Sequence, residues 1–409
     1  MAQQLYFSRD TKVYIQVGSA IWEMPVLDGF SFSQATNVSE IALSEMEDSA
    51  GNSKRGRRAF NDSLAPAEWS FSTYVRPFVS AGTGAGAADT AANHHAVEEV
   101  LWALMAGPAT YASNTFPGFT ADTTDVNITF ANSNKSTLGT ASIYFVVGNA
   151  NKKVYKLRDS VVNEAALNFE IDGIATIDWS GFSAEIVDDT ANGIPTATVY
   201  EDIAATDNFI RNRLTQLTVE PNYPDWVTGT SYQVGDIVKN TTYIYRALEA
   251  HTAAASFATD LAATKWELIL EDSYNLTLTG GNITVTNNIT YITPEELGTV
   301  NIPIGHVTGG RAVSGSFTCY LLKDTATTDK SSDFFQDVKG ISSVVTNSFA
   351  LTFKVGGTAT PSLELSMPTA HVDIPTHSVE DVIALETNFN ALPSSIELTD
   401  EVTLTYKGA

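Results

Sequence analysis

The side chains best suited to chemistry in this sequence form one short cluster, HHAVEE, at residues 94–99. Side chains four residues apart share one face of a helix, so each histidine would face the glutamate four positions further on. Imidazole and carboxylate groups bind zinc, but a zinc hydrolase also needs a third ligand and a general base, and neither is evident. We therefore predict an ordinary helix at residues 94–105 with a solvated first turn, ended by Gly107-Pro108.

Other motifs that could support catalysis lack their partners. The run GTGAGA at residues 82–87 is followed by no Gly-Lys-Ser/Thr of a phosphate-binding loop, and no parallel strand–helix–strand unit surrounds it. It is typical of a flexible loop of small residues. His306, His371 and His377 stand apart from any cluster of ligands. We predict no catalytic site, no metal and no cofactor, and hence a protein that is not an enzyme.

The charge of the chain limits its partners. The 409 residues include 23 Lys and Arg against 47 Asp and Glu, a formal net charge of −24. Phosphate backbones are bound mainly through Lys and Arg, so specific DNA binding is disfavoured. A wall that DNA slides past without adhering is compatible with the same charge.

The N-terminal segment and the cysteine content indicate the compartment. The start, MAQQLYFSRDTKVYIQV, has no basic segment followed by an apolar one, so we expect no signal peptide. No apolar run approaches the ~18 residues that a membrane helix needs. Cys319 is the single cysteine and can form no intrachain disulfide. We expect a protein that is made in a cytoplasm and does not associate with membranes.

The elements that must position any site are strands. Hydrophobic residues make up 43 % of the chain, and Ser, Thr, Asn, Val, Ile and Tyr recur in short runs of alternating polarity. Alternation at period two is typical of half-buried strands. The sequence therefore predicts a mainly β fold.

The order of the predicted elements occurs twice. SFSTYV at residues 70–75 matches SFTCYL at residues 316–321, and YFSRDTKVYIQV at residues 6–17 matches FIRNRLTQLTV at residues 209–219. Each copy continues through polar residues, one short helix and further strands, and the second helix is predicted at residues 332–338. We predict two tandem β-sandwich domains, each with one short helix.

The repeat sets the expected domain boundaries. The first copy spans residues 1–190 and a linker spans residues 191–206. The second copy comprises residues 207–222 and 272–409, and a small β module at residues 223–271 interrupts a hairpin that the first copy closes with a short turn. Insertions are tolerated at exposed loop tips because the two chain ends lie close together there.

The inserted segment carries a spaced set of aromatic residues around a Gly-Asp turn. Its members are Trp226, Tyr232, Gly235-Asp236-Ile237-Val238, Tyr245-Arg246-Ala247 and Trp266. In this pattern the segment resembles the small chitin-binding type of carbohydrate-binding module. Members that bind chitin present exposed aromatic rings just after the Tyr-x-Ala strand, but LEAHTA at residues 248–253 contains none. The candidate glycan contacts are Trp226, Tyr245 and Trp266, and the competing interpretation places these side chains in the core of the module.

One basic cluster stands out against the acidic background. It comprises Lys54, Arg55, Arg57 and Arg58, in the long loop between two strands of the first copy. Arginine donors could contact a phosphate or pair with an acidic surface of a neighbouring subunit. The net charge favours the second interpretation, so we expect an assembly loop.

Two segments of the second copy carry a further resemblance. NITYITPEELG at residues 288–298 is followed by SGSFTCYL at residues 314–321, and a long loop, this strand and one short helix recur together. In this diffuse pattern, over most of the chain, the sequence resembles bacteriophage tail tube (major tail) proteins. The resemblance implies a structural virion protein: a β-sandwich with a flanking helix, whose inner strands close into six-fold rings and whose long loops join ring to ring.

The resemblance and the repeat together predict an assembly. Two copies per chain imply trimeric rings with pseudo-six-fold symmetry, stacked head to tail, and six-chain rings are the alternative. The rings would form the conduit for DNA ejection in the virion tail, through which DNA passes without specific binding. Implied partners are tape-measure and tail-tip or terminator proteins, and the chain would be made in the host cytoplasm. An inserted module on the outside would collide with a contractile sheath, so we expect a non-contractile tail.

Two other classes of function remain open. The first is a virion decoration or adhesin protein that binds host surface glycans through residues 223–271, which predicts an exposed aromatic strip. The second is an enzyme such as a depolymerase, which predicts a pair of acids or a triad in a cleft.

Overall fold

The computed structural model is a mainly β protein, which confirms the predicted fold class. Strands account for 53 % of the structure and helices for 8 %. The structure describes residues 5–41, 49–52, 58–82, 90–130, 138–148, 151–199, 207–270, 273–294, 297, 301–322, 331–332, 334, 338, 349–379 and 381–408.

In the first half of the chain, five strands form what we call the first side sheet. Their order is β2 (Ala20–Met24), β1 (Thr11–Val17), β11 (Ala141–Val147), the first part of β12 (Lys153–Glu170) and β14 (Glu185–Asp188). All neighbours are antiparallel.

Five strands of the second half form the second side sheet in a matching order. They are β21 (Tyr274–Leu276), β15 (Gln216–Pro221), β26 (Phe349–Val355), β27 (Ser362–Val372) and β30 (Thr403–Lys407). β30 also pairs with β10 (Val126–Thr129), which pairs with β9 (Phe119–Ala121). The C-terminal strand therefore links the two halves of the chain.

The second part of β12 continues into another sheet, which we call the long sheet. Its eight strands follow the order β3 (Ser31–Ser33), β6 (Ala67–Tyr74), β13 (Thr176–Ser183), β12, β22 (Leu278–Thr286), β25 (Ala312–Tyr320), β29 (Ile383–Ala391) and β28 (Thr376–Val379). The two halves meet in the middle, where residues 164–170 of β12 pair with residues 280–286 of β22.

The core lies between the long sheet and the side sheets. Alternation places one residue in two on the inside: in β6, Trp69 and Phe71 are each 2 % exposed, whereas their neighbours are not buried. Helix α1 (Glu99–Ala106) packs against β12. Its Trp102 contacts Trp179 of β13, with ring centroids 4.8 Å apart, and donates its indole N–H to the Tyr406 hydroxyl of β30 at 2.7 Å.

The helix of the first copy is shorter than the sequence indicates. Residues His94–Ala96 form strand β8, which pairs with β7 (Pro77–Val79). The residues expected in a solvated first turn are buried: His94, His95, Glu98 and Glu99 are each at most 8 % exposed. The prediction was wrong here because pairing with β7 satisfies the backbone groups that a helix would otherwise use. The helix predicted at residues 332–338 lies largely outside the described residues.

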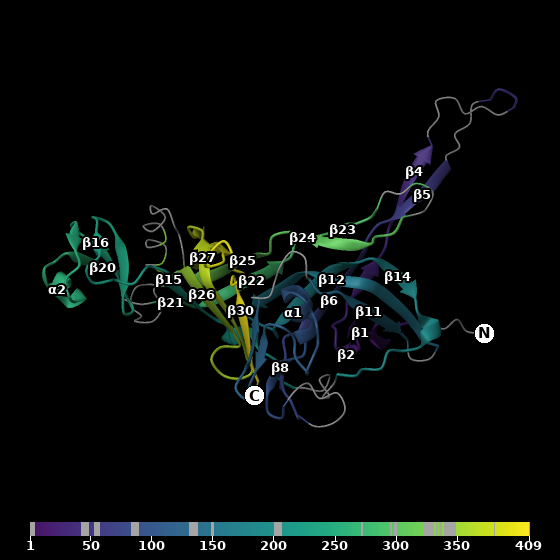
Figure 1. Cartoon of the computed structure of the whole chain (residues 1–409), viewed down its shortest axis with the longest axis horizontal. Coiled ribbons are helices and arrows are strands. Elements are labelled where there is room, and N and C mark those ends of the chain that lie inside the picture. The colour runs from purple at the N-terminus through teal and green to yellow at the C-terminus, as the bar shows by residue number, and fades with distance from the viewer. Residues whose placement is uncertain are drawn as a thin grey trace.

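Two hairpins form what we call the arm, which begins where the chain leaves β3 and β22 of the long sheet. β4 (Thr36–Ile41) pairs with β5 (Arg58–Leu64), and β23 (Ile289–Ile292) pairs with β24 (Gly305–Thr308). The two hairpins are joined where the Leu64 N–H donates to the Asn301 carbonyl at 2.9 Å. The β4–β5 hairpin extends well away from the rest of the molecule (Figure 1). The sequence predicted only a long loop at this position.

The inserted segment has a core of its own. β17 (Ile237–Asn240), β18 (Tyr243–Ala247) and β20 (Trp266–Leu270) form one sheet, β16 (Ser231–Tyr232) pairs with β19 (His251–Thr252), and α2 (Phe257–Ala262) is the helix. Ile244 of β18 belongs to the main core, whereas the other buried apolar residues of the segment form a separate cluster: Tyr232, Val238, Tyr245, Ala247, Ala253, Phe257 and Trp266. The segment lies at one end of the molecule, beyond β15 and β21 (Figure 1). The domain boundaries themselves stay a prediction.

Phe317→Ala is expected to lower the free energy of unfolding by about 3–5 kcal/mol, since it leaves a cavity in the core. The Phe317 ring is 0 % exposed and lies 6.3 Å from the ring of Phe389, centroid to centroid. Urea denaturation of the unassembled chain, followed by tryptophan fluorescence, measures the change. The control Ile396→Ala removes a fully exposed side chain and should change stability by less than about 0.5 kcal/mol. Equal effects of the two substitutions would contradict this core.

Candidate assembly and channel surfaces

The long sheet has one apolar face, turned to the core, and one polar face. Side chains alternate along a strand, so the residues between the buried ones all point to the same, uncovered side. The residues that we call the polar face are Glu68, Ser70, Ser72, Tyr74, Glu164, Ala166, Asn168, Glu170, Thr176, Asp178, Ser180, Asn282, Thr284, Thr286, Ser314, Ser316, Thr318, Glu386, Asn388 and Asn390. This set contains five carboxylates and neither Lys nor Arg.

Hydrogen bonds between neighbouring strands order the polar face. Ser72 Oγ donates to Asp178 Oδ1 at 2.5 Å, and Asn168 Nδ2 donates to Asp178 Oδ2 at 3.0 Å. In the second half, Ser316 Oγ donates to Asn282 Oδ1 at 3.0 Å. These donors are occupied by neighbouring side chains, and the unpaired carboxylates repel phosphate. The face suits a wall along which a polyanion moves without binding.

Within the described residues, the long sheet ends in an unpaired edge on each side. β3 pairs only with β6, and β28 pairs only with β29. All four residues of β28 are exposed, and Val379 is 73 % exposed. An unpaired edge offers backbone N–H and C=O groups to a further strand. The two ends of the sheet are therefore candidate surfaces for association with other chains.

The junction between the two halves shows how such edges are joined. β12 and β22 pair in antiparallel register, with Asn168 opposite Asn282. Asn287, which follows β22 and is 4 % exposed, strengthens the junction. Its Nδ2 donates to the carbonyl groups of Met105 at 3.1 Å and Val162 at 3.2 Å. Both backbone pairing and a buried side chain therefore hold the halves together.

The basic cluster predicted as an assembly loop follows β4 in the sequence. Lys54, Arg55 and Arg57 lie outside the described residues, and Arg58 is the first residue of β5. Sequence reasoning missed the exposed apolar side chains of the arm, although isolated apolar residues in polar strands are a signal for them. Each at least 45 % exposed, they are Val38, Phe60, Ile292, Ile304 and Val307. These side chains are candidate contacts between subunits.

The candidate glycan contacts belong to the core of the inserted segment. Tyr245 is 9 % exposed and Trp266 is 4 % exposed, and both rings pack against Phe257 at centroid distances of 4.6 and 5.8 Å. Trp226 is partly buried against the same cluster. Stacking on a sugar needs an exposed flat ring, so this burial disfavours sugar binding by Tyr245 and Trp266. Glycan binding by the segment stays a prediction.

The histidines and glutamates of residues 94–99 belong to a buried polar network around β8 and the start of α1. His95 Nδ1 lies 2.9 Å from Glu99 Oε2. Burial raises the pKa of Glu98 to about 7, although the Tyr406 hydroxyl and the Arg76 guanidinium lower it in part. Among the described residues, no group of three or more His, Cys, Asp or Glu side chains is arranged to hold a metal ion. The network therefore connects α1 with the C-terminal strand.

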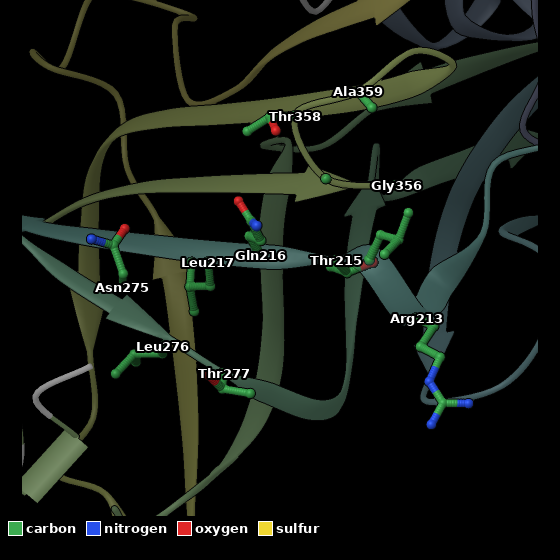
Figure 2. Close-up of a pocket in the computed structure, with 12 residues that line it drawn as sticks. Arg213, Thr215, Gln216, Leu217, Asn275, Leu276, Thr277, Gly356, Thr358 and Ala359 are labelled. Carbon is green, nitrogen blue, oxygen red and sulfur yellow. The ribbon is translucent and has the colours of Figure 1, made fainter. Parts of the chain in front are cut away.

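One hollow of about 680 Å³ opens beside β15 and β21. Figure 2 shows Arg213, Gln216 and Asn275 around it, with the turn at residues 356–359 alongside. No Asp, Glu, His or Cys lines it, so it contains neither a general base nor a pair of acids. Within the described residues, no helix is long and apolar enough to span a membrane.

The unpaired sheet edges, the polar face and the exposed apolar side chains of the arm are therefore candidate surfaces for assembly. No family model matches the chain. The chain is 29 % identical over 389 residues to tail tube protein pb6 of Escherichia phage T5, and the alignment covers 93 % of this chain and 69 % of that protein. This similarity supports the predicted relation to phage tail tube proteins. The resemblance of residues 223–271 to a carbohydrate-binding module stays a prediction.

Glu98→Gln is expected to change how stability depends on pH. The carboxyl of Glu98 ionises near pH 4.5 in the unfolded chain and near pH 7 in the folded chain. Its contribution to stability is therefore complete below pH 4.5 and is lost as the pH rises to about 7, a loss on the order of 3 kcal/mol. Glu98→Gln should remove this loss, and Glu397→Gln, at an exposed position, should retain it. Urea unfolding at pH 4.5 and 7.5 tests this, and the same decline in both variants would contradict it.

Proposed function

We propose that this chain is a structural subunit of a phage tail tube in the virion tail, and that three chains close each ring of the tube. The similarity to a tail tube protein over nearly the whole chain supports the tube function. One observation supports the ring. Among the described residues, the long sheet runs without interruption through both halves of the chain and ends in two unpaired edges. Pairing such edges between chains removes them.

Matching strand pairings support the proposal of two tandem copies. β1 pairs with β2 and β11, and β15 pairs with β21 and β26 in the same way. The order β11–β12–β14 recurs as β26–β27–β30, and β3–β6–β13 recurs as β22–β25–β29. In this correspondence, β22 takes the place of β3, and β28 takes the place of the second part of β12.

By this correspondence, the junction between two chains would use the same strand pairing as the junction inside one chain. Inside the chain, the second part of β12 pairs with β22. Between chains, β28 of one subunit would pair with β3 of the next. Three chains supply six copies, so the ring has three-fold symmetry and pseudo-six-fold architecture, with the same type of heterologous contact at every junction. Six-chain rings are the alternative.

The register of the proposed junction follows from the paired strands. On one side, Ser31 pairs with Ser70 and Asn282 pairs with Ser316, at matching positions of SFSTYV and SFTCYL. Ser31 is therefore the counterpart of Asn282. The register of β28, on the other side of the junction, follows in the same way from the residue pairs that β13 and β29 form.

On that other side, Asn168 and Ser378 are counterparts. They pair with Thr176 and Ala384, which in turn pair with Tyr74 and Tyr320. Since Asn168 lies opposite Asn282 inside the chain, Ser378 would lie opposite Ser31 of the next subunit.

Ring closure would place the polar face in the lumen. The side sheets and α1 lie on the core side of the long sheet, so a closed long sheet has these elements outside and the polar face inside. That face carries Glu68, Glu164, Glu170, Asp178 and Glu386 and no cationic side chain. A carboxylate-bearing wall without Lys or Arg lets DNA pass during ejection without being held.

The remaining surfaces suit the ends and the outside of a tube. The arm, with its exposed apolar side chains, would contact the next ring in a head-to-tail stack. The terminal rings would meet tape-measure and tail-tip or terminator proteins. The inserted segment projects at the far end of the second half (Figure 1). On the outside of a ring it would occupy the space of a contractile sheath, which favours a non-contractile tail.

Oxidation of a Ser31→Cys, Ser378→Cys double variant tests the ring. Cα atoms of directly opposed residues in an antiparallel pair lie within the reach of a disulfide, and the native Cys319 is buried. Assembled tubes should give covalent dimers and trimers on a non-reducing gel, with a ladder that stops at three chains. Each single variant is the matched control and should remain monomeric.

Electron microscopy of the same samples completes this test. Cylinders with three-fold rings support the proposal. A ladder that continues to six chains would replace the three-chain ring with the six-chain alternative. Purified chain that forms no cylinders would contradict the tube function.

The alternative function, glycan binding through residues 223–271, is separable from assembly. Because the inserted segment has its own core, its replacement by a short Gly-Ser linker should leave tube formation unchanged. A glycan array with the intact protein measures sugar binding, and the deletion variant is the control. Binding to any glycan that disappears in the deletion variant would establish the adhesin role, and loss of tubes in this variant would show that the segment belongs to the assembly machinery.

A further inference from the structure

A short segment at the start of the second half docks onto the first half. It lies against the turn between β12 and β13, where the Ala175 N–H donates to the Ile210 carbonyl at 2.8 Å. The Asn212 N–H donates to the Gly173 carbonyl at 3.2 Å. The segment therefore adds a short extended strand beside the beginning of β13, in line with the end of β6.

Side chains of the same segment complete the contact. The ring of Phe209 packs edge-on against Tyr74, with centroids 5.2 Å apart, and the guanidinium of Arg76 lies 5.3 Å from the Phe209 ring centroid. Arg213 forms an exposed ion pair with Asp172 at 3.3 Å. Because an exposed ion pair contributes little, the apolar and cation–π contacts contribute most to docking.

The N-terminal segment of the chain is the counterpart of this docked segment. A single turn of 3₁₀ helix precedes β1 at Ser8–Asp10, and another precedes β15 at Asn212–Leu214. In this register, the three residues before Ser8 correspond to residues 209–211. Leu5, Tyr6 and Phe7 are 73 %, 49 % and 51 % exposed. Three consecutive exposed apolar residues are a candidate contact surface.

The surface that would receive this segment also has a counterpart. In the first half, the Val75 N–H donates to the Ala175 carbonyl at 2.9 Å, and in the second half the Leu321 N–H donates to the Ile383 carbonyl at 2.9 Å. Ile383 is therefore the counterpart of Ala175. By the same correspondence, Val382 is the counterpart of Ile174.

Burial differs between these matched positions. Ala175 is 0 % exposed and Arg76 is 4 % exposed in the first half, where residues 209–213 cover them. Their counterparts Ile383 and Leu322 are 40 % and 37 % exposed. Including two neighbours, the exposed residues that we call the acceptor surface are Tyr320 (40 %), Leu322 (37 %), Val382 (57 %) and Ile383 (40 %).

We propose that residues 5–8 of one subunit dock onto the acceptor surface of the neighbouring subunit in the ring. In Figure 1 the N-terminus lies on the side of the molecule away from β25, whose last residue Tyr320 belongs to the acceptor surface, so the contact joins different chains. Docking buries apolar side chains on both partners and adds backbone hydrogen bonds at the turn between β28 and β29. The N-terminal segment is thus a clasp across the junction that β28 and β3 form.

Mixed single-cysteine subunits test the clasp. Ile174 and Arg211 form an antiparallel bridge inside the chain, and their counterparts are Val382 and Phe7. Tubes assembled from a mixture of Phe7→Cys and Val382→Cys subunits should give disulfide-linked dimers on oxidation, because opposed residues lie within disulfide reach. Each variant assembled alone should remain monomeric. A mixture of Phe7→Cys with Ile396→Cys, whose parent residue is fully exposed, is the matched control and should also remain monomeric.

Val382→Asp provides a second measurement. It leaves the fold intact because the side chain is exposed, and it should raise the critical concentration for tube assembly about tenfold by removing an apolar contact at the junction. Ile396→Asp should leave the critical concentration unchanged. Cross-linking of the Phe7–Val382 mixture together with this shift supports the clasp.

The clasp rests on the proposed ring, and the two can fail separately. Tubes that cross-link through Ser31→Cys and Ser378→Cys but not in the Phe7–Val382 mixture would overturn the clasp and leave the tube function standing. A cross-link of Phe7→Cys to Ile396→Cys would also overturn it. Absence of tubes in the parent protein would overturn the proposed function, and the clasp with it.

Discussion

Unpaired backbone groups at the edges of a sheet are the constraint on which the rest of this structure depends. A strand that lacks a neighbour on one side leaves a row of N–H and C=O groups that must bind water or another strand. In the long sheet this requirement is met between the two halves where β12 pairs with β22 and the sheet passes from one half to the other. Among the described residues it is left open at β3 and at β28. In the proposed ring, the same physical requirement that joins the two halves would direct the association of whole chains, and repetition of one junction would be sufficient to close the ring.

The alternation of side chains along the long sheet gives its two faces separate tasks. One face contributes large buried rings such as Trp69, Phe317 and Phe389 to the core, and this apolar burial stabilises the sandwich. The other face carries mostly hydroxyl, amide and carboxylate groups, and several of them form hydrogen bonds across the strands. Because alternate residues of the same strands form the two faces, a shift of register by one residue would exchange the faces. The alternation thus preserves the polar face as well as the core.

A buried polar network adds a second link between the halves of the chain. Trp102 of α1 donates to the Tyr406 hydroxyl of the C-terminal strand, and the neighbouring Glu98 carboxyl is fully buried. Burial raises the pKa of Glu98 to about 7, and the Tyr406 hydroxyl of β30 lowers it in part. Since β30 also pairs with β10, the C-terminal strand helps to hold the first half in place. The two halves consequently form one structural unit.

The sequence by itself determined the class of fold, because alternation at period two and the scarcity of helical patterns are local properties of the chain. It also indicated the repeat, through SFSTYV and SFTCYL, and the relation to tail tube proteins. Local patterns could not show that His94–Ala96 pair with β7, since that strand depends on Pro77–Val79, a contact between distant segments. Nor could they show that Tyr245 and Trp266 are buried or which strands end the long sheet. Those features depend on long-range pairing and packing, which only the tertiary structure decides.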